Sequence, residues 1–438
     1  MGRPPWSAGP SRPPGTSATR RPASPSSPPR PTSTARRRGG SSTGTTSAPR
    51  AAPGSHLARI DDDGRSPVVD AEVLLDQNLG ATAGAYPGTG ADLLLGPRYA
   101  LLRRDLVAAA AGRRPGTVRS GAAGGGTAPL RVVVAMGGAP SAEVRAFFEA
   151  VVASLAADDL SIRVLDGRAD AAAELAAADL AVAAAGSTCW ELGLLAVPSV
   201  VVSVAPNQEP LARRLGERGA ARDLGDLTTL IPEEVALEVR RLVASPSDRA
   251  ALSRAIAALV DGRGAARVAT RLRSGLLAMR PVGPGDVRTV HELNDDPAVR
   301  AVSWSSEPIP WADHERWFAA RLADPRSHLY LGHAPDGSLV GLVRFQVEAR
   351  VATIGVVAHA SQRGRGWGAA LIDAGVRRLE ADLGAGGGIE PMVRIDALVK
   401  PGNEASSRAF LDADFDPEPS GDPDVLRYAR PHGRRADG

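Results

Sequence analysis

Short apolar runs alternate with amphipathic segments through the middle of the chain. The apolar runs are typical of buried strands and lie at residues 131–136, 161–165, 179–184 and 199–204. The amphipathic segments repeat apolar residues at helical spacing and lie at residues 141–157, 169–178, 187–195 and 207–216. This alternation predicts a doubly wound parallel sheet, and ligands bind such sheets at the carboxyl ends of the strands.

Segments on either side extend this α/β region. Residues 57–106 hold short apolar pieces separated by Gly, Pro and acidic residues, and each piece reads as a strand or as the turn after one. Helical periodicity with arginine-rich polar faces is found at residues 232–244, 247–260 and 264–278. We therefore expect one unit over residues 56–115 and a Rossmann-like domain over residues 128–275.

A different pattern begins near residue 277. Strands are expected at residues 277–282, 339–347, 351–357 and 393–399, and helices at residues 284–294, 311–322 and 369–383. Between the second central strand and the long helix, residues 362–370 read QRGRGWGAA. The glycines let the backbone approach a ligand, the helix start presents free amides, and the two arginines add charged donors. This turn predicts a pyrophosphate site, and a turn whose glycines serve only close packing is the alternative.

These elements, followed by the sequence Asn403–Phe410, resemble a GNAT-family N-acetyltransferase over residues 276–431. The resemblance implies a mixed, mostly antiparallel sheet and acetyl-CoA as the cofactor. It also implies that residues 363–368 hold the pyrophosphate and that Asn403 and Ser406 lie against the pantetheine arm. The implied cofactor-binding positions are Val356, Val357, Arg363, Gly364, Arg365, Gly366, Trp367, Gly368, Ala369, Asn403 and Ser406.

Two catalytic positions of this family are changed in the sequence. Phe410 stands where many members carry a tyrosine that protonates the leaving thiolate, and Thr353 stands where a central strand often carries a glutamate base. Phenylalanine cannot donate a proton. The candidate catalytic residues are His359 and Glu348, and Glu307 and His314 are further candidates. Each can accept a proton near neutral pH if it is suitably placed. An ordinary surface or loop role is the alternative for each.

Ordered matches to a second family run through residues 57–225. They are Ile60-Asp-Asp, Leu74-Leu-Asp-Gln-Asn, Leu95–Arg103, Met136-Gly-Gly, Ala185–Glu191 and Asn207-Gln208. In this order they resemble the UDP-sugar hydrolases of pseudaminic acid biosynthesis and their relatives in spore-coat polysaccharide synthesis, which are glycosyltransferase-B-like proteins. The resemblance implies that the unit over residues 56–115 is the remnant of a first Rossmann-like domain. The implied substrate-binding positions are Gly138, Gly186, Ser187, Thr188, Glu191, Asn207 and Gln208.

Some residues that carry this second resemblance have another explanation, and one motif of the family is not found. Helix capping explains Ser187 and Thr188 equally well on their own. The Gly-x-Gly-His segment, whose histidine serves hydrolysis in that family, does not precede Leu57. We therefore expect nucleotide-sugar binding over residues 128–275 and leave open whether the hydrolase-like module is active.

Composition changes the picture mainly at the N-terminus. Residues 1–55 hold nine arginines and no Asp, Glu or Lys, so they contribute +9 to a chain of formal charge +3 and leave −6 for the remainder. An acidic remainder argues against a nucleic-acid partner. The Pro-, Ser- and Arg-rich first 55 residues are expected to be a disordered tail. We expect no membrane span and no metal site, and the single cysteine, Cys189, fits a reducing cytoplasm.

The expected fold class is α/β, with a partial glycosyltransferase-B-like doubly wound (Rossmann-like) sheet followed by a GNAT domain. We expect an acetyl-CoA-dependent N-acetyltransferase acting on a UDP-linked or free amino sugar in nonulosonic acid or surface polysaccharide biosynthesis. One alternative is a degenerate nucleotide-sugar-binding scaffold. Others are a bifunctional UDP-sugar hydrolase and acetyltransferase whose N-terminus is misannotated, and a glycosyltransferase fragment.

Overall fold

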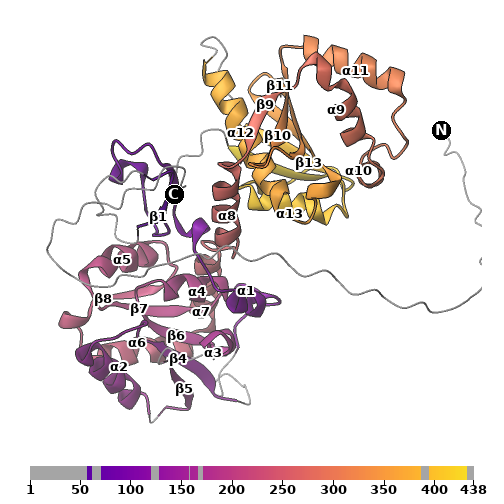
Figure 1. Ribbon diagram of the computed structural model, residues 1–438. Helices are drawn as coiled ribbons and strands as arrows, with labels where there is room; N and C mark the ends of the chain where they lie inside the picture. Colours follow the sequence, from indigo (N-terminus) through magenta and orange to yellow (C-terminus); the bar gives the residue numbers. More distant parts are fainter. Residues whose placement is uncertain are drawn as a thin grey trace, which may run out of the picture. The chain divides into compact units, whose positions relative to one another are not determined.

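The computed structural model describes residues 57–61, 71–119, 128–156, 158–165, 171–385 and 394–431. The tail expected over residues 1–55 lies outside them. The described residues form three β-sheets with intervening helices (Figure 1).

A five-stranded parallel sheet occupies the middle of the chain, in the order β5-β4-β6-β7-β8. Its strands are β4 (Leu130–Ala135), β5 (Leu160–Leu165), β6 (Leu180–Ala184), β7 (Ser199–Ser203) and β8 (Arg222–Asp226). The path starts inside the sheet at β4, places β5 on one side and then runs through β6 to β8 on the other. The predicted doubly wound parallel sheet is confirmed.

Helices cover both faces of this sheet. They are α1 (Arg104–Ala110), α2 (Ala142–Ser154), α3 (Ala171–Ala177), α4 (Thr188–Leu194), α5 (Glu209–Glu217), α6 (Pro232–Ala244) and α7 (Pro246–Ala257). Val132 and Val134 of β4 pack against α2 and α6, whereas Val133 and Ala135 pack against α1, α3 and α4. Because alternate side chains point to opposite faces, burial of both faces explains the unbroken apolar runs in the sequence.

A three-stranded parallel sheet precedes it along the chain. Its strands are β1 (Ala58–Ile60), β2 (Val73–Asp76) and β3 (Asp92–Leu95), in that order across the sheet. These are the short strands expected over residues 57–106. Asp76 is buried at the end of β2 and accepts a hydrogen bond from the hydroxyl of Tyr86 at 2.8 Å.

The C-terminal part forms a seven-stranded sheet in the order β14-β15-β13-β12-β11-β10-β9. The strands are β9 (Ala278–Pro281), β10 (Ser327–His333), β11 (Leu339–Glu348), β12 (Val351–Ala358), β13 (Arg394–Val399), β14 (Asp416–Glu418) and β15 (Leu426–Pro431). Within this sheet β12 and β13 pair in parallel, and the other neighbouring strands pair antiparallel. The expectation of a mixed, mostly antiparallel sheet is confirmed.

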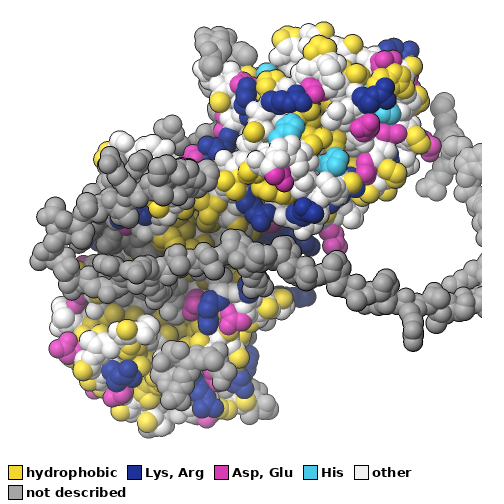
Figure 2. Space-filling view, viewed as in Figure 1, with side chains coloured by type: hydrophobic (Ala, Val, Ile, Leu, Met, Phe, Trp, Pro, Cys, Tyr) yellow, Lys and Arg dark blue, Asp and Glu magenta, His cyan; other side chains and the backbone are white. Residues whose placement is uncertain are grey.

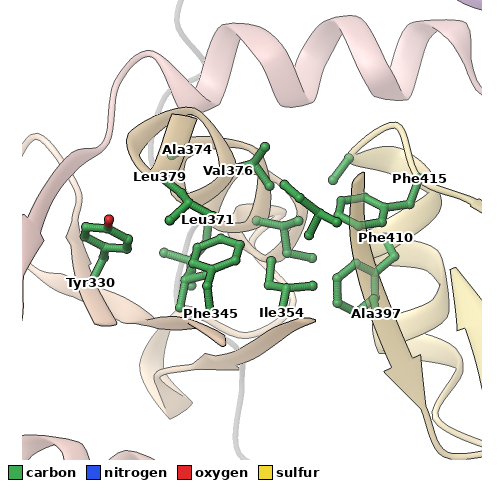
Figure 3. Packing of buried hydrophobic residues seen from close by; sticks show 14 of the residues in the cluster. Tyr330, Phe345, Ile354, Leu371, Ala374, Val376, Leu379, Ala397, Phe410 and Phe415 are labelled. Atoms are coloured by element: carbon green, nitrogen blue, oxygen red, sulfur yellow. The ribbon is translucent and has the colours of Figure 1, made fainter. Parts of the chain in front are cut away.

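Helices pack on each face of this sheet as well. They are α9 (Val287–Asn294), α10 (Pro297–Ala301), α11 (Trp311–Ala323), α12 (Trp367–Ala385) and α13 (Glu404–Asp412). A further helix, α8 (Gly264–Ser274), packs against α12. Phe345 of β11 and Ile354 of β12 share a core with α12, with Phe410 of α13 at one end of the cluster and Tyr330 at the other (Figure 3). Leu342 of β11 packs on the opposite face, against α9 and α11.

The sequence pattern does not indicate β8, β10 or α10. β8 reads Arg-Asp-Leu-Gly-Asp and is an edge strand, so no apolar run marks it. In β10 the histidines at positions 328 and 333 flank the short apolar core. α10 has only five residues, which is too short to show a helical period.

Candidate functional site

The site in the C-terminal part begins where β12 and β13 separate. Their parallel pairing stops at Ile354 and Ala397. β12 nevertheless continues to Ala358 and β13 to Val399. In the described sheet, the rest of β12 therefore has no partner on its β13 side, and its backbone groups on that side face open space. A cavity of about 490 Å³ opens at this divergence.

The cavity has two walls of different origin. The first is built from the separated strand ends and α13, and includes Gly355, Val356, Val357, Asn403, Ser406 and Phe410. The second is built from α9 to α11 and the centre of β11, and includes Arg300, Trp304, Asp313, His314, Trp317 and Arg344. Four of the predicted cofactor positions thus lie together on the first wall.

A glycine turn leads from β12 into α12 beside this cavity. Gly364 and Gly366 have φ angles of 73° and 78°, in the left-handed region that favours glycine. Among the described residues, no hydrogen bond occupies the amides of these two glycines. The first amides of α12 also lack partners inside the helix. Free N–H groups at the positive end of a long helix can hold an anion, and we call this set of N–H groups the anion cradle.

Three arginines surround the glycine turn. Arg363 pairs with Asp296 at the start of α10, with 2.9 Å between Nη2 and Oδ1. Arg365 is exposed. Arg273 of α8 lies over the Trp367 ring at 5.3 Å and donates to the carbonyl of Arg365 at 2.6 Å. Sequence reasoning missed Arg273, because it lies about 90 positions before the turn and outside the stretch that resembles an acetyltransferase.

α13 supplies the far end of the first wall. Asn403 caps this helix by accepting from the amide of Ser406 at 3.1 Å, so the two predicted residues are held together. Phe410 is buried, and its ring stacks on Tyr428 and meets Phe415 edge to face. The residue that stands in place of a tyrosine therefore serves the core and offers no proton donor.

The two predicted catalytic residues lie outside the cavity lining. Nδ1 of His359 lies 2.8 Å from Oγ of Ser361. The same nitrogen accepts a hydrogen bond from the Ser361 amide, so the His359 side chain caps the short 3-10 turn after β12. Glu348 is exposed and pairs with Val351, at the end of β11 away from the divergence. Glu307 is not among the residues that line the cavity either. Its backbone carbonyl accepts a hydrogen bond from Arg300, which does line the cavity.

His314 does line the cavity. Its ring is buried, and Nε2 lies 2.8 Å from the carbonyl of Val287, which can only accept. The proton is thus held on Nε2, and Nδ1 carries the free electron pair. Burial lowers the pKa of His314, so the ring is neutral at pH 7.

The predicted nucleotide-sugar positions gather at one edge of the five-stranded sheet. Gly138 follows β4, and Gly186 and Ser187 follow β6. β4 and β6 are neighbours, and the path reverses between them, which makes this edge the topological switch point where such sheets bind ligands. Ser187 is the N-cap of α4, but its hydroxyl makes no capping hydrogen bond in the described structure.

The remaining predicted positions border the same edge. The amide of Gln208 would lie 3.8 Å from a Cβ at Gly186, and its oxygen accepts from the Val204 amide at 3.1 Å. Asn207 is exposed beside it, and Thr188 opens α4. Glu191, one turn further, is half-buried, and burial raises the pKa of its carboxyl despite Arg103 at 3.9 Å.

Two comparisons find similar proteins for parts of the chain. The family model described as the Acetyltransferase (GNAT) domain matches residues 277–416. The spore coat polysaccharide biosynthesis protein SpsG of Bacillus subtilis (strain 168) is 32% identical over 112 residues, which are 25% of this chain and 33% of that protein. The chain thus spans about a third of the length of this curated relative.

Solved structures give a weaker likeness. A spermidine N-acetyltransferase from Vibrio cholerae in complex with CoA and spermine is 18% identical, with a TM-score of 0.32, and the match covers 36% of this chain and 96% of that one. A dodecameric structure of spermidine N-acetyltransferase from Vibrio cholerae in an intermediate state is 20% identical, with a TM-score of 0.29, covering 36% and 94%. At these TM-scores the likenesses carry no conclusion about this chain.

The separated parallel strands and the glycine turn at a helix start both lie within the stretch that this family model matches. Residues 277–416 are a GNAT acetyltransferase domain, and the cofactor of this N-acetyltransferase domain is acetyl-CoA. In the part of the chain that the structure describes, no helix is long and apolar enough to cross a membrane.

Proposed function

We propose that this protein transfers the acetyl group of acetyl-CoA to the amine of a free or nucleotide-linked amino sugar, in nonulosonic acid or surface polysaccharide biosynthesis. The observation that carries the proposal is the cavity at the divergence of β12 and β13. One wall holds four of the positions expected to contact the cofactor, Val356, Val357, Asn403 and Ser406, and the other wall is the proposed place of the acceptor. Its volume, about 490 Å³, suits a small molecule.

The residues present fit the cofactor. Acetyl-CoA supplies the thioester carbonyl that the amine attacks. The free amides of the glycine turn and the start of α12 suit a pyrophosphate, and the open edge of β12 offers backbone donors and acceptors to an extended arm. Holding both reactants in one cavity supplies much of the acceleration, because the reaction becomes effectively unimolecular.

Proton transfer is the part of the expected mechanism in which this sequence departs from the family pattern. His359 and Glu348 remain our proposed bases from the sequence, although neither lines the cavity. His314 does line it and has a free Nδ1, so its geometry favours it over both. With Phe410 in place of a tyrosine, we propose that the thiolate either leaves unassisted or takes its proton from water.

An amino sugar is proposed as the acceptor because of the other half of the chain. The likeness to a polysaccharide biosynthesis protein and the ligand edge of the five-stranded sheet both support a module that binds a nucleotide sugar. One chain that carries both sites could receive or pass on the same sugar. The residue ranges 56–115, 128–275 and 276–431 are the domains that we propose for these roles.

The test follows free CoA release by the full-length protein with acetyl-CoA and a panel of amino sugars, both free and linked to UDP. We expect release with at least one sugar and none without an acceptor. Failure of every sugar, with acetyl-CoA binding detected by calorimetry, would reject the acceptor class. Failure to bind acetyl-CoA would reject the whole proposal.

A second function is favoured by the likeness over 112 residues to the polysaccharide biosynthesis protein. In this alternative the five-stranded sheet belongs to a UDP-sugar hydrolase, or to a scaffold that binds nucleotide sugars without turning them over. Release of UDP from a UDP-amino sugar in the absence of acetyl-CoA would support the hydrolase. Thermal stabilisation by UDP without any turnover would support the scaffold.

A further inference from the structure

We propose that the acceptor carries an anionic group, a phosphate or a carboxylate, and that Arg344 binds it. This inference rests on the proposed acetyltransferase function and specifies the chemistry of its acceptor. It starts from a charged side chain in the cavity that neither the cofactor positions nor the expected catalytic residues explain.

Arg344 lies in the middle of β11 and faces α9 and α11, on the same side of the sheet as Leu342. Its side chain is exposed to the cavity. The guanidinium lies 5.9 Å from the centre of the Trp317 ring, which holds it by a cation–π contact. Among the residues that the structure describes, no carboxylate or carbonyl accepts a hydrogen bond from it. Its planar fork of donors is therefore available to a ligand.

The neighbouring strand makes room for this side chain. Gly355 of β12 is the residue directly opposite Arg344. A Cβ at Gly355 would lie only 2.6 Å from Nε of Arg344. Glycine at this point thus lets the arginine cross the strand towards the divergence, where the thioester of the cofactor is expected. An anion on Arg344 would be held on the acceptor side of that point.

The charges around Arg344 are not neutralised inside the cavity. Arg300 donates to the backbone carbonyls of Glu307 and Ser305, and Arg321 donates to the side-chain oxygen of Gln346. All three acceptors are uncharged. The inner wall of the cavity shields the guanidinium from bulk water; this burial, followed by the charges of Arg321 and Arg300, lowers the pKa of Arg344.

Negative charge is scarce in the same lining. Asp313 is the carboxylate among the cavity-lining residues, and it accepts a hydrogen bond from Arg316. Lys400 adds another cation on the opposite wall. On the face of the C-terminal domain seen in Figure 2, by contrast, basic and acidic side chains are interspersed. Within the cavity lining, Arg300, Arg344 and Lys400 thus outnumber the one carboxylate.

This charge pattern selects among acceptors. A polyamine would bring two or more positive charges against Arg300, Arg344 and Lys400, which is unfavourable at short range. A neutral sugar would leave the Arg344 fork without a charged partner. An amino sugar that carries a phosphate or a carboxylate presents one amine for acetylation and one anion for bidentate binding by arginine.

The experiment measures CoA release by the full-length protein at saturating acetyl-CoA. The acceptors are one amino sugar as the free sugar, as the 1-phosphate and linked to UDP, an amino uronic acid, and spermidine. The variants are Arg344→Gln and Arg344→Lys. Arg326→Gln is the control, because Arg326 is exposed at the edge of β10 and lies outside the cavity.

We expect the wild type to favour an anionic acceptor, and the phosphate and carboxylate arms identify which anion it is. Arg344→Gln should lower kcat/KM for that acceptor by roughly 10- to 100-fold, the range of a charge-assisted hydrogen bond, while leaving the free sugar unchanged. Arg344→Lys should retain part of the preference, and Arg326→Gln all of it. The KM for acetyl-CoA should not move.

Several outcomes would overturn the inference. Arg344→Gln could reduce turnover of the free sugar and of the anionic sugar equally, or the wild type could use spermidine as well as the anionic sugars. If the protein still binds acetyl-CoA, either result rejects the role of Arg344 in binding an anionic acceptor and leaves the acetyltransferase proposal intact. Absence of CoA release with every acceptor removes both.

Discussion

Gly364 and Gly421 have the same backbone conformation, with φ at 73° in both. A Cβ at either position would meet nothing within 4 Å, so a substitution costs only conformational strain. Their surroundings differ. Gly364 belongs to the turn whose free amides form the anion cradle, whereas Gly421 lies in an exposed loop between β14 and β15. The pair separates the backbone effect of alanine from its effect on the cofactor.

We predict that Gly364→Ala weakens acetyl-CoA binding by roughly tenfold, because a shifted backbone loses about one amide hydrogen bond to a charged phosphate. Calorimetry with acetyl-CoA measures the change. Both variants should lose ~1 kcal/mol of stability, because alanine is strained at these φ angles. Gly421→Ala should keep the full affinity for acetyl-CoA. Equal affinity in the two variants would contradict the assignment of the cradle.

At the scale of one residue, type and position in the sequence identified some of the site. The glycines of the turn were identified because local backbone geometry demands that residue type, and Asn403 was identified through the resemblance to the GNAT family. Residue type and sequence position did not distinguish His314 and Arg344 from ordinary surface residues. Their roles depend on Val287, Trp317 and Gly355, which are contributed by other elements.

Among the elements, α8 connects most directly to the acetyltransferase fold. It packs on α12, and its Arg271 and Ser274 reach Asp373 of that helix at 3.1 and 2.6 Å. Arg430 of β15 donates to the same carboxylate at 2.8 Å. Burial alone would raise the pKa of Asp373, but the charges of Arg430 and Arg271 outweigh it and hold the pKa at about 2.

We predict that Asp373→Asn lowers the free energy of unfolding by about 3–5 kcal/mol, because two buried arginines lose their charged partner. Urea unfolding measures this loss. Asp424→Asn, at an exposed loop position, should change stability by less than about 0.5 kcal/mol.

The same carboxylate predicts a pH dependence. Because its folded pKa of about 2 lies below the ordinary 3.8, its contribution is fully present above about pH 4 and is lost as the pH falls through the folded value. The stability difference between wild type and Asp373→Asn should therefore be constant from pH 5 to 7 and shrink below pH 4. A difference that stays constant down to pH 3 would show that the charge is not what matters.

α8 also carries Arg273, which contacts the glycine turn from outside the matched acetyltransferase stretch. We predict that Arg273→Gln weakens acetyl-CoA binding by about 3- to 10-fold at low salt, with a smaller effect at high salt, because one exposed cation near the phosphates is lost. Binding isotherms at two salt concentrations test this.

Arg288→Gln is the matched control for this change. Arg288 lies over the Trp311 ring at the same 5.3 Å but away from the turn. The control should leave acetyl-CoA binding unaltered at both salt concentrations. A similar loss in the two variants would mean that Arg273 acts through general charge and not through its place at the turn.

At the scale of the whole molecule, the two proposed ligand sites lie at the strand ends of two different sheets. One is the switch point between β4 and β6, and the other is the divergence of β12 and β13. No residue is shared by the two sets of predicted positions. Each ligand should therefore stabilise the chain independently of the other.

We predict that UDP and acetyl-CoA each raise the free energy of unfolding, by about 2.7 kcal/mol at a hundredfold excess over Kd. Glu191→Gln should diminish the effect of UDP alone, and Gly364→Ala that of acetyl-CoA alone. Thermal unfolding with each ligand measures both. A variant that weakens both effects would show that the two edges are not separate sites.

The amino-acid sequence by itself determined the doubly wound sheet, the mixed sheet and the glycine turn between β12 and α12. These follow from periodicity and local backbone preference, which act over a few neighbouring residues. Only the tertiary structure decided where β12 and β13 part, and which side chains from α9, α11 and β11 face the resulting cavity. The partners of Arg344 and His314 are separated from them along the chain, and no local pattern records a contact between such distant positions.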